Sequence, residues 1–304
     1  MAAVNVENLK KTYGGGTVKA LDGVSFKVED GELFGLIGPD GAGKTSLFRI
    51  LTTLLLADSG RAEVDGMDVV EDYRKIRRNI GYMPGRFSLY QDLTVEENLS
   101  FFATVFNTTI EENYHLVEDI YRQIEPFKKR KAGKLSGGMK QKLALSCALI
   151  HAPHVLFLDE PTTGVDPVSR KEFWEMLRKL KKNFGLSIIV STPYMDEAVQ
   201  CDRIVLMQNG KFLRVDTPEG IVDTYTKTLW ALRSDNMHKL LTDLRCVDGV
   251  TAAFAFGENH HTTVDPSRLT MDSLKGQLVA MGHHNVVIET VRPTIEDCFM
   301  DLQE

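Results

Sequence analysis

The sequence lacks the features that place a chain in a membrane. No stretch of its 304 residues reaches the run of about 18 apolar residues that a membrane-spanning helix needs. The segment from Met1 to Lys11 contains no apolar core of signal-peptide length. We therefore expect a protein that neither crosses nor enters the membrane by itself.

The sequence also has few cysteines and no net positive charge. The four cysteines, Cys147, Cys201, Cys246 and Cys298, are far apart and form no C-x-x-C pair, which argues against a disulfide framework or a zinc site. Acidic residues outnumber basic ones by 42 to 36, for a net charge of −6, so no overall positive field attracts a nucleic-acid backbone. These features favour a reducing cytosol and no nucleic-acid partner.

The clearest signal that is present is a phosphate-binding loop, because residues 38–45 match the pattern G-x-x-x-x-G-K-[ST]. The candidate contacts to a nucleotide are Gly38, Pro39, Asp40, Gly41, Ala42, Gly43, Lys44, Thr45 and Ser46. The loop lies between a predicted buried strand, Glu32–Ile37, and a predicted helix that continues through Thr52, which is the context that the motif requires. In such loops the lysine reaches the β- and γ-phosphates and the hydroxyl binds Mg²⁺. The alternative is a glycine-rich turn with a stray lysine.

A pair of carboxylates, Asp159 and Glu160, follows the apolar run 154–158. This run is typical of a parallel strand covered on both faces, and ligands bind at the carboxyl ends of such strands. We expect Asp159 to hold Mg²⁺, directly or through water, and Glu160 to polarise the water that attacks the γ-phosphate. The alternative is an exposed acidic strand end.

The third element is Leu135-Ser136-Gly137-Gly138-Met139. Ser136 can cap a helix whose positive end, with the N–H groups of Gly137 and Gly138, can bind phosphate. With the phosphate loop upstream and the acidic strand end downstream, the chain from about Val4 to Gly220 resembles the ATP-binding cassette (ABC) family, whose signature is L-S-G-G-x. The resemblance implies ATP as the ligand and two domains paired head to tail, each signature helix closing on the γ-phosphate held by the other domain.

Two further positions match that family. Tyr13 falls where the resemblance places an adenine-stacking aromatic residue, and the alternative is a packed tyrosine at a strand end. Asp166, in Gly164-Val165-Asp166-Pro167, resembles an aspartate that lies across the dimer interface. Asp166 can also be an ordinary helix N-cap, and both roles can hold together.

Two positions depart from the family. Gly85 stands where a glutamine usually follows G-Y-x-P, and Pro193 stands where a histidine usually touches the γ-phosphate. Neither replacement offers a side-chain hydrogen bond, and Gln91 lies too far along the chain to replace the glutamine. We therefore expect a chain that binds ATP, hydrolyses it slowly in its own loop and can still complete a partner's site.

The signature form Leu135–Lys142, the segment Ser191–Ala198 and the ending Pro293–Phe299 resemble the branch of drug, antibiotic and polysaccharide exporters, whose membrane subunits are separate chains. The resemblance implies a membrane-spanning permease and a second ABC subunit, identical or different, as partners. It also implies a cytoplasmic location at the inner face of the cell membrane. The alternatives are an ATP-occluding regulatory subunit of a heterodimer and a non-transport ABC ATPase.

The predicted fold class is α/β. Residues 1–222 are expected to form a P-loop domain with a β-meander, a parallel sheet core and a helical subdomain at about residues 86–150. We expect meander strands at 4–9 and 24–28, and a second fully apolar strand at 187–190 in the parallel core. A helical pattern runs from Thr94 to about Phe127 and opens with a capping box formed by Thr94 and Glu97. Residues 223–304 show the order βαββαβ and then a helix. We expect a small α+β domain there, ferredoxin-like and concerned with dimerisation or regulation.

Overall fold

The computed structural model describes residues 2–303. The chain forms two compact units, of which the first ends at Pro218 and the second begins at Glu219. The boundary expected from the sequence, after residue 222, coincides with the end of a short helix, α7 (Pro218–Val222). No helix in the described part of the chain is both long enough and apolar enough to span a bilayer.

The first unit is built on a six-stranded sheet with the order β10-β9-β3-β8-β7-β6. Its strands are β3 (Leu33–Ile37), β6 (Ile80–Met83), β7 (Val155–Asp159), β8 (Ser187–Thr192), β9 (Arg203–Gln208) and β10 (Lys211–Asp216). All neighbours are parallel except β10, which pairs antiparallel with β9. The predicted parallel core is thus confirmed, and β3 and β7 are buried over their whole length.

A second sheet has the order β2-β1-β4-β5 and is antiparallel. It comprises β1 (Ala2–Tyr13), β2 (Val18–Glu29), β4 (Ser59–Val64) and β5 (Met67–Asp68). The strands expected at 4–9 and 24–28 are longer than the apolar pattern suggests, and bulges interrupt their register. Strand β4 follows the phosphate loop in the sequence and yet pairs with β1. It therefore joins the sheet through a crossover connection, and the sheet is not the simple meander that we expected.

Helix α1 (Lys44–Leu51) lies in the core between the two sheets. Phe48 of α1 packs edge to face against Phe157 of β7, with ring centroids 5.6 Å apart. Such aromatic contacts add to the stabilisation from apolar burial. The packing fixes the start of α1, and hence the phosphate loop, relative to the carboxyl end of β7.

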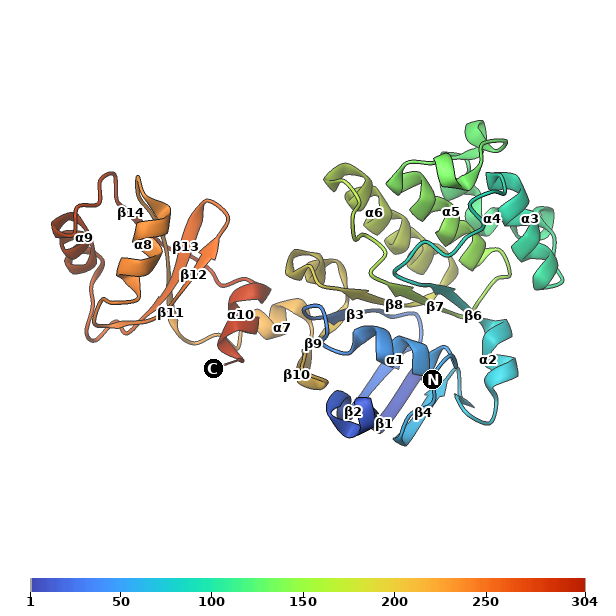
Figure 1. The fold of residues 1–304 in the computed structure, drawn as a ribbon, viewed down its shortest axis with the longest axis horizontal. Coiled ribbons are helices and arrows are strands. Elements are labelled where there is room, and N and C mark those ends of the chain that lie inside the picture. The colour runs from blue at the N-terminus through green and yellow to red at the C-terminus, as the bar shows by residue number, and fades with distance from the viewer. Residues whose placement is uncertain (1, 304) are drawn as a thin grey trace. The chain divides into compact units, whose positions relative to one another are not determined.

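The other helices of the unit lie on the opposite side of the six-stranded sheet or at its edge (Figure 1). They are α2 (Tyr73–Asn79), α3 (Val95–Val105), α4 (Ile110–Tyr121), α5 (Gly137–Leu149) and α6 (Pro167–Phe184). The helical pattern expected from Thr94 to about Phe127 is divided into α3 and α4. The division follows from Asn107, whose φ of 56° cannot continue a right-handed helix.

The predicted capping box at the start of α3 is confirmed. The Thr94 hydroxyl accepts a hydrogen bond from the Glu97 N–H, and the Glu97 carboxylate accepts one from the Thr94 N–H. We expect Thr94→Ala to lower the free energy of unfolding by about 1 kcal/mol, measured as a shift of the urea midpoint. Thr94→Ser keeps the hydroxyl, so an equal loss in both variants would contradict this role.

The second unit is an antiparallel sheet with two helices. Its elements are β11 (Thr228–Arg233), α8 (Met237–Leu244), β12 (Val250–Phe256), β13 (Asn259–Val264), α9 (Met271–Ala280), β14 (Val287–Thr290) and α10 (Ile295–Asp301). The strand order β12-β13-β11-β14 places the first and last strands side by side. This confirms the predicted βαββαβ arrangement. Leu240, Leu274 and Leu278 of the two helices are fully buried in its own core.

Candidate functional site

The glycine-rich loop between β3 and α1 packs too closely for side chains at two positions. A Cβ at Gly38 would lie 2.1 Å from the Met207 carbonyl oxygen, and one at Gly43 would lie 2.1 Å from the Ala20 carbonyl oxygen. Gly43 also has φ of 110° and Gly41 has φ of 79°, which side chains disfavour. Only glycine permits this path, and the position of Gly41 is open to solvent.

Lys44 is the first residue of α1 and is only 3% exposed. Its ammonium donates to the carbonyl oxygens of Gly38 at 2.7 Å and Pro39 at 3.0 Å. It also lies 3.3 Å from Oε1 of Glu160. A buried cation requires such partners, and here they are the loop itself and the neighbouring carboxylate. The structure therefore brings the two predicted site residues Lys44 and Glu160 together.

Asp159 ends β7 and is 2% exposed. Its Oδ1 accepts hydrogen bonds from the Thr45 hydroxyl at 3.3 Å and the Ser191 hydroxyl at 2.6 Å. Thr45 and Asp159 thus form one cluster, as expected, and Ser191 joins it from the end of β8. Ser191 is not among the site residues predicted from the sequence. Its signal was a hydroxyl at the carboxyl end of a strand that runs parallel to β7.

Glu160 occupies a left-handed conformation, with φ of 50°. Its N–H donates to the carbonyl oxygen of Ser191 at 3.0 Å and to the hydroxyl of the same residue at 3.1 Å. A non-glycine residue in this region stores strain and persists only where its surroundings hold it. The strain coincides with the carboxylate that the sequence singled out for catalysis.

Tyr13, at the end of β1, is 40% exposed. Its hydroxyl lies 3.2 Å from the Ser46 hydroxyl on α1, and the ammonium of Lys11 is 5.9 Å from its ring centroid. The ring therefore stands beside the phosphate-loop helix with part of its surface open to solvent.

The signature segment caps α5 as expected, because the Ser136 hydroxyl accepts a hydrogen bond from the Met139 N–H. Ser136 and Gly137 are exposed. A Cβ at Gly138 would lie 2.7 Å from the Ser169 hydroxyl, so the segment packs directly on the start of α6. Within residues 2–303 no hydrogen bond links this segment to the phosphate loop.

Asp166 is the N-cap of α6, and its Oδ1 accepts from the Ser169 N–H at 3.0 Å. Hydrogen bonds from Ser169 lower the pKa of the Asp166 carboxyl below its ordinary value. The capping role is therefore present in the single chain, and Asp166 lies beside the signature segment through Ser169.

The two departures from the family pattern follow the carboxyl ends of β6 and β8. A Cβ at Gly85 would lie 3.1 Å from the Asp159 carbonyl oxygen, so a side chain here would start against the acidic pair. Pro193 directly follows Thr192, whose carbonyl oxygen accepts from the Gly38 N–H at 3.3 Å. Gln91 lies against Gly133, whose N–H donates to its carbonyl oxygen.

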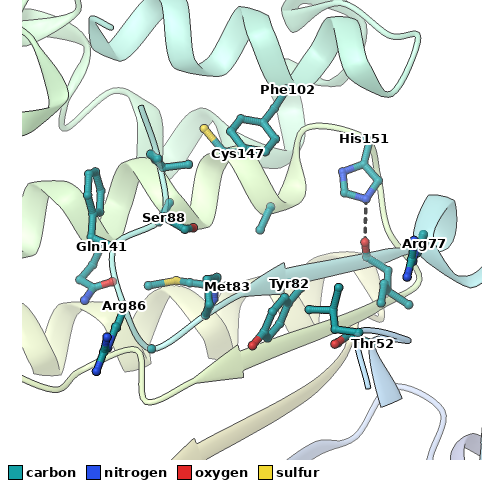
Figure 2. A pocket seen from close by; sticks show the side chains of 18 of the residues that line it. Thr52, Arg77, Tyr82, Met83, Arg86, Ser88, Phe102, Gln141, Cys147 and His151 are labelled. Atoms are coloured by element: carbon teal, nitrogen blue, oxygen red, sulfur yellow. Dashed lines mark hydrogen bonds between the residues drawn. The ribbon is translucent and has the colours of Figure 1, made fainter. Parts of the chain in front are cut away.

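A hollow of about 280 Å³ lies between the loop after β6 and the helices α3 and α5 (Figure 2). Phe102, Ala144 and His151 are among the residues that line it. The His151 ring stacks on Phe106, with ring centroids 3.8 Å apart. Burial lowers the pKa of His151, which favours the neutral form of its ring.

Tyr82, on β6, also lines the hollow. Burial and the charge of Asp159 raise the pKa of its phenol to about 12.

A family profile described as ABC transporter matches residues 21–163. The chain is also 35% identical over 281 residues to the doxorubicin resistance ATP-binding protein DrrA of Mycobacterium tuberculosis, covering 90% of this chain and 82% of that protein. The chain belongs to the ABC transporter family. This cassette is 37% identical to the probable multidrug ABC transporter ATP-binding protein YbhF of Escherichia coli, with 99% of the chain covered. It spans about half of the length of YbhF, 52%.

Solved structures of other ATP-binding cassettes have a fold similar to that of this chain. CbiO1 from Clostridium perfringens, part of the ABC transporter complex cbiONQ, superposes with a TM-score of 0.65 at 29% identity, over 73% of this cassette and 91% of that chain. MJ0796 is described as a dimeric cassette in a post-hydrolysis state bound to ADP and Pi. It superposes with a TM-score of 0.64 at 27% identity, over 70% of this cassette and 98% of that chain. The α/β P-loop fold expected from the sequence is therefore confirmed.

Proposed function

We propose that this cassette binds ATP and hydrolyses it to drive export through a separate membrane-spanning permease. The observation that carries the proposal is the convergence of Lys44, Thr45, Asp159 and Glu160 on the mouth of the phosphate loop. The fit to a polyphosphate is good, because the loop presents backbone N–H groups at Gly41 and Gly43 and a buried ammonium beneath them. Tyr13 supplies an exposed ring for the adenine.

The same cluster fits Mg²⁺. The Thr45 hydroxyl and the Asp159 carboxylate share a hydrogen bond, and both are hard oxygen ligands of the type that Mg²⁺ selects. When bound, the ion neutralises charge on the β- and γ-phosphates. Ser191 holds the Asp159 carboxylate in place through its 2.6 Å hydrogen bond.

Glu160 is the group best placed to accept a proton from the attacking water. Its carboxylate lies 3.3 Å from the Lys44 ammonium, which we expect to reach the γ-phosphate, and its side chain is partly exposed, at 22%. The side chains of Gly85 and Pro193 can contribute no hydrogen bond to the transferring phosphoryl group. We therefore propose that binding is intact and that hydrolysis at this loop is slow.

The signature segment serves a second cassette in this proposal. Ser136 and Gly137 are exposed at a helix N-terminus, where anions bind, and they are not bonded to their own phosphate loop. We propose a head-to-tail dimer in which Ser136, Gly137 and Gly138 contact the γ-phosphate of the neighbour. Asp166 lies at the same face. The similar cassette MJ0796 is described as dimeric, which supports the pairing of two cassettes.

Export is supported by the relatives, which are named for multidrug transport, doxorubicin resistance and, in Burkholderia and Rhizobium, Nod factor export. We place the cassette on the cytoplasmic side of the membrane, held there by the permease. The C-terminal unit is proposed to support dimerisation or regulation.

The hollow between α3 and α5 is the proposed docking place for a short helix of the permease. Its apolar lining suits the apolar face of such a helix, and Tyr82 of β6, the strand next to β7, is part of that lining. Movement of α3 and α5 on closure can thus be passed to the membrane subunit.

Filling the hollow tests the docking place. We expect Ala144→Trp to abolish co-purification of the permease, because the indole occupies the space that the helix needs. Val105→Trp is the control, since Val105 is 55% exposed on α3 and does not line the hollow. Equal recovery of the permease with both variants would place the interface elsewhere.

Purification of the native complex tests the function as a whole. A membrane-spanning subunit together with ATP hydrolysis supports the proposal. Gly85 and Pro193 favour one alternative, an ATP-occluding subunit in a heterodimer. Two different cassettes in the complex, with turnover confined to the partner, would establish that alternative. A chain with no affinity for ATP would overturn both.

A further inference from the structure

Glu197 is a buried carboxylate outside the phosphate loop, the acidic strand end and the signature segment. It lies in a short 3₁₀ helix, η4 (Met195–Gln200), and is 3% exposed. Its Oε2 accepts hydrogen bonds from the hydroxyl of Thr192 at 2.6 Å and from that of Thr162 at 3.0 Å. Its other oxygen lies 3.6 Å from Nε of Arg170 on α6. A buried carboxylate costs free energy unless it is paired in this way.

The two threonines belong to the two segments that frame the site. Thr162 is two residues after Glu160, and the N–H of Thr163 donates to the Glu160 carbonyl oxygen at 3.2 Å. Thr192 ends β8, and its carbonyl oxygen accepts from the Gly38 N–H at 3.3 Å. Both threonines are fully buried. One carboxylate therefore joins the turn that carries the proposed base to the strand end that supports the phosphate loop.

The turn needs such support because Glu160 is held in a left-handed conformation that relaxes unless its surroundings oppose it. Its own backbone is anchored at Ser191. Thr162 supplies a second anchor on the other side of the strained residue. A positional error of about 1 Å in a reacting group can cost on the order of 10²-fold in rate.

We infer that Glu197 is a positioning residue for ATP hydrolysis, which sets the place of Glu160 relative to the phosphate loop through Thr162 and Thr192. The inference rests on the proposed hydrolysis at this loop. Pro193 increases the importance of this link, because a proline contributes no side-chain hydrogen bond at that position. Arg170 balances the buried charge and lies 4.2 Å from the Tyr194 ring centroid.

The test removes one anchor at a time from the full chain. Thr162→Val deletes the hydroxyl and keeps the shape of the side chain. We expect the single-turnover rate of ATP hydrolysis to fall at least tenfold while the Kd for ATP stays within twofold. Thr162→Ser keeps the hydroxyl and is expected to restore the rate. Glu197→Gln keeps an acceptor oxygen and is expected to lower the rate less than Glu197→Ala.

Thr263→Val is the matched control. Thr263 is also buried, at 7%, and its hydroxyl lies 2.8 Å from the Tyr225 hydroxyl in the C-terminal unit. The control is expected to lose similar thermal stability with no change in rate. If Glu197→Ala fails to fold, the single-turnover rates of Thr162→Val and Thr192→Val still test whether the two hydrogen bonds to Glu197 position Glu160.

Three results would overturn the inference. One is a rate for Thr162→Val within twofold of the parent. Another is an equal loss of rate in Thr162→Ser, because that variant retains the hydroxyl. The third is a parent chain that binds ATP without hydrolysing it, which removes the proposed hydrolysis as well. The first two results would contradict the role of Glu197 and leave the proposed ATP hydrolysis intact. Only the third result would contradict both.

Discussion

Replacing Glu160 by glutamine is expected to lower the rate of ATP hydrolysis by about 10²- to 10⁴-fold, the range that general bases contribute. The amide has nearly the same shape but accepts no proton. It also removes the negative charge 3.3 Å from the Lys44 ammonium, so the lysine is freer to meet phosphate. We therefore expect ATP binding to persist or tighten, measured by equilibrium titration beside single-turnover hydrolysis.

Glu172→Gln is the control for this variant. Glu172 is an exposed acid on α6 whose carboxylate accepts from the Lys142 ammonium at 2.8 Å, so its loss is expected to leave the rate unchanged. A Glu160→Gln protein that turns over ATP within threefold of the parent would show that another group accepts the proton.

The second large effect runs in the opposite direction. A Gly85→Gln, Pro193→His double variant is expected to hydrolyse ATP faster by about 10²-fold or more, since one preorganised contact to a transition state is worth on the order of 10²- to 10³-fold. The Cβ introduced at position 85 would begin 3.1 Å from the Asp159 carbonyl oxygen, which a small shift can accommodate. The restored amide would then start beside the acidic pair.

Gly85→Ala separates crowding from chemistry in this experiment, because it adds the Cβ without the amide. It is expected to be no faster than the parent. If the double variant also fails to exceed the parent in single-turnover rate, other residues of this chain already compensate for Gly85 and Pro193.

Local sequence signals predicted much of this molecule. The parallel strands at Val155–Asp159 and Ser187–Thr192 were visible as short apolar runs, because strands buried on both faces need them. The Thr94 capping box was visible because it needs only two residues at a fixed spacing. The phosphate loop and the acidic strand end were visible for the same reason, and the structure brings Lys44 and Glu160 within contact.

Contacts between distant segments were not visible. Ser191 meets Asp159 only because β7 and β8 are neighbours in the sheet, and Glu197 meets Thr162 across 35 residues of chain. The pairing of β4 with β1 likewise depends on the tertiary fold. The spacing of apolar residues along the sequence indicates which face of a segment is buried. It does not indicate which segments become neighbours, and these contacts depend on that.

The packing of Gly138 on Ser169 has a consequence for two bound nucleotides. Gly138 packs directly on Ser169, and the Ser169 N–H is bonded to Asp166, so we expect the start of α5 and the start of α6 to move together. In the proposed dimer these two helix starts face the opposite subunit. We therefore expect that nucleotide bound at one site of that dimer alters the affinity of the other site, and thermodynamic reciprocity would make the influence mutual.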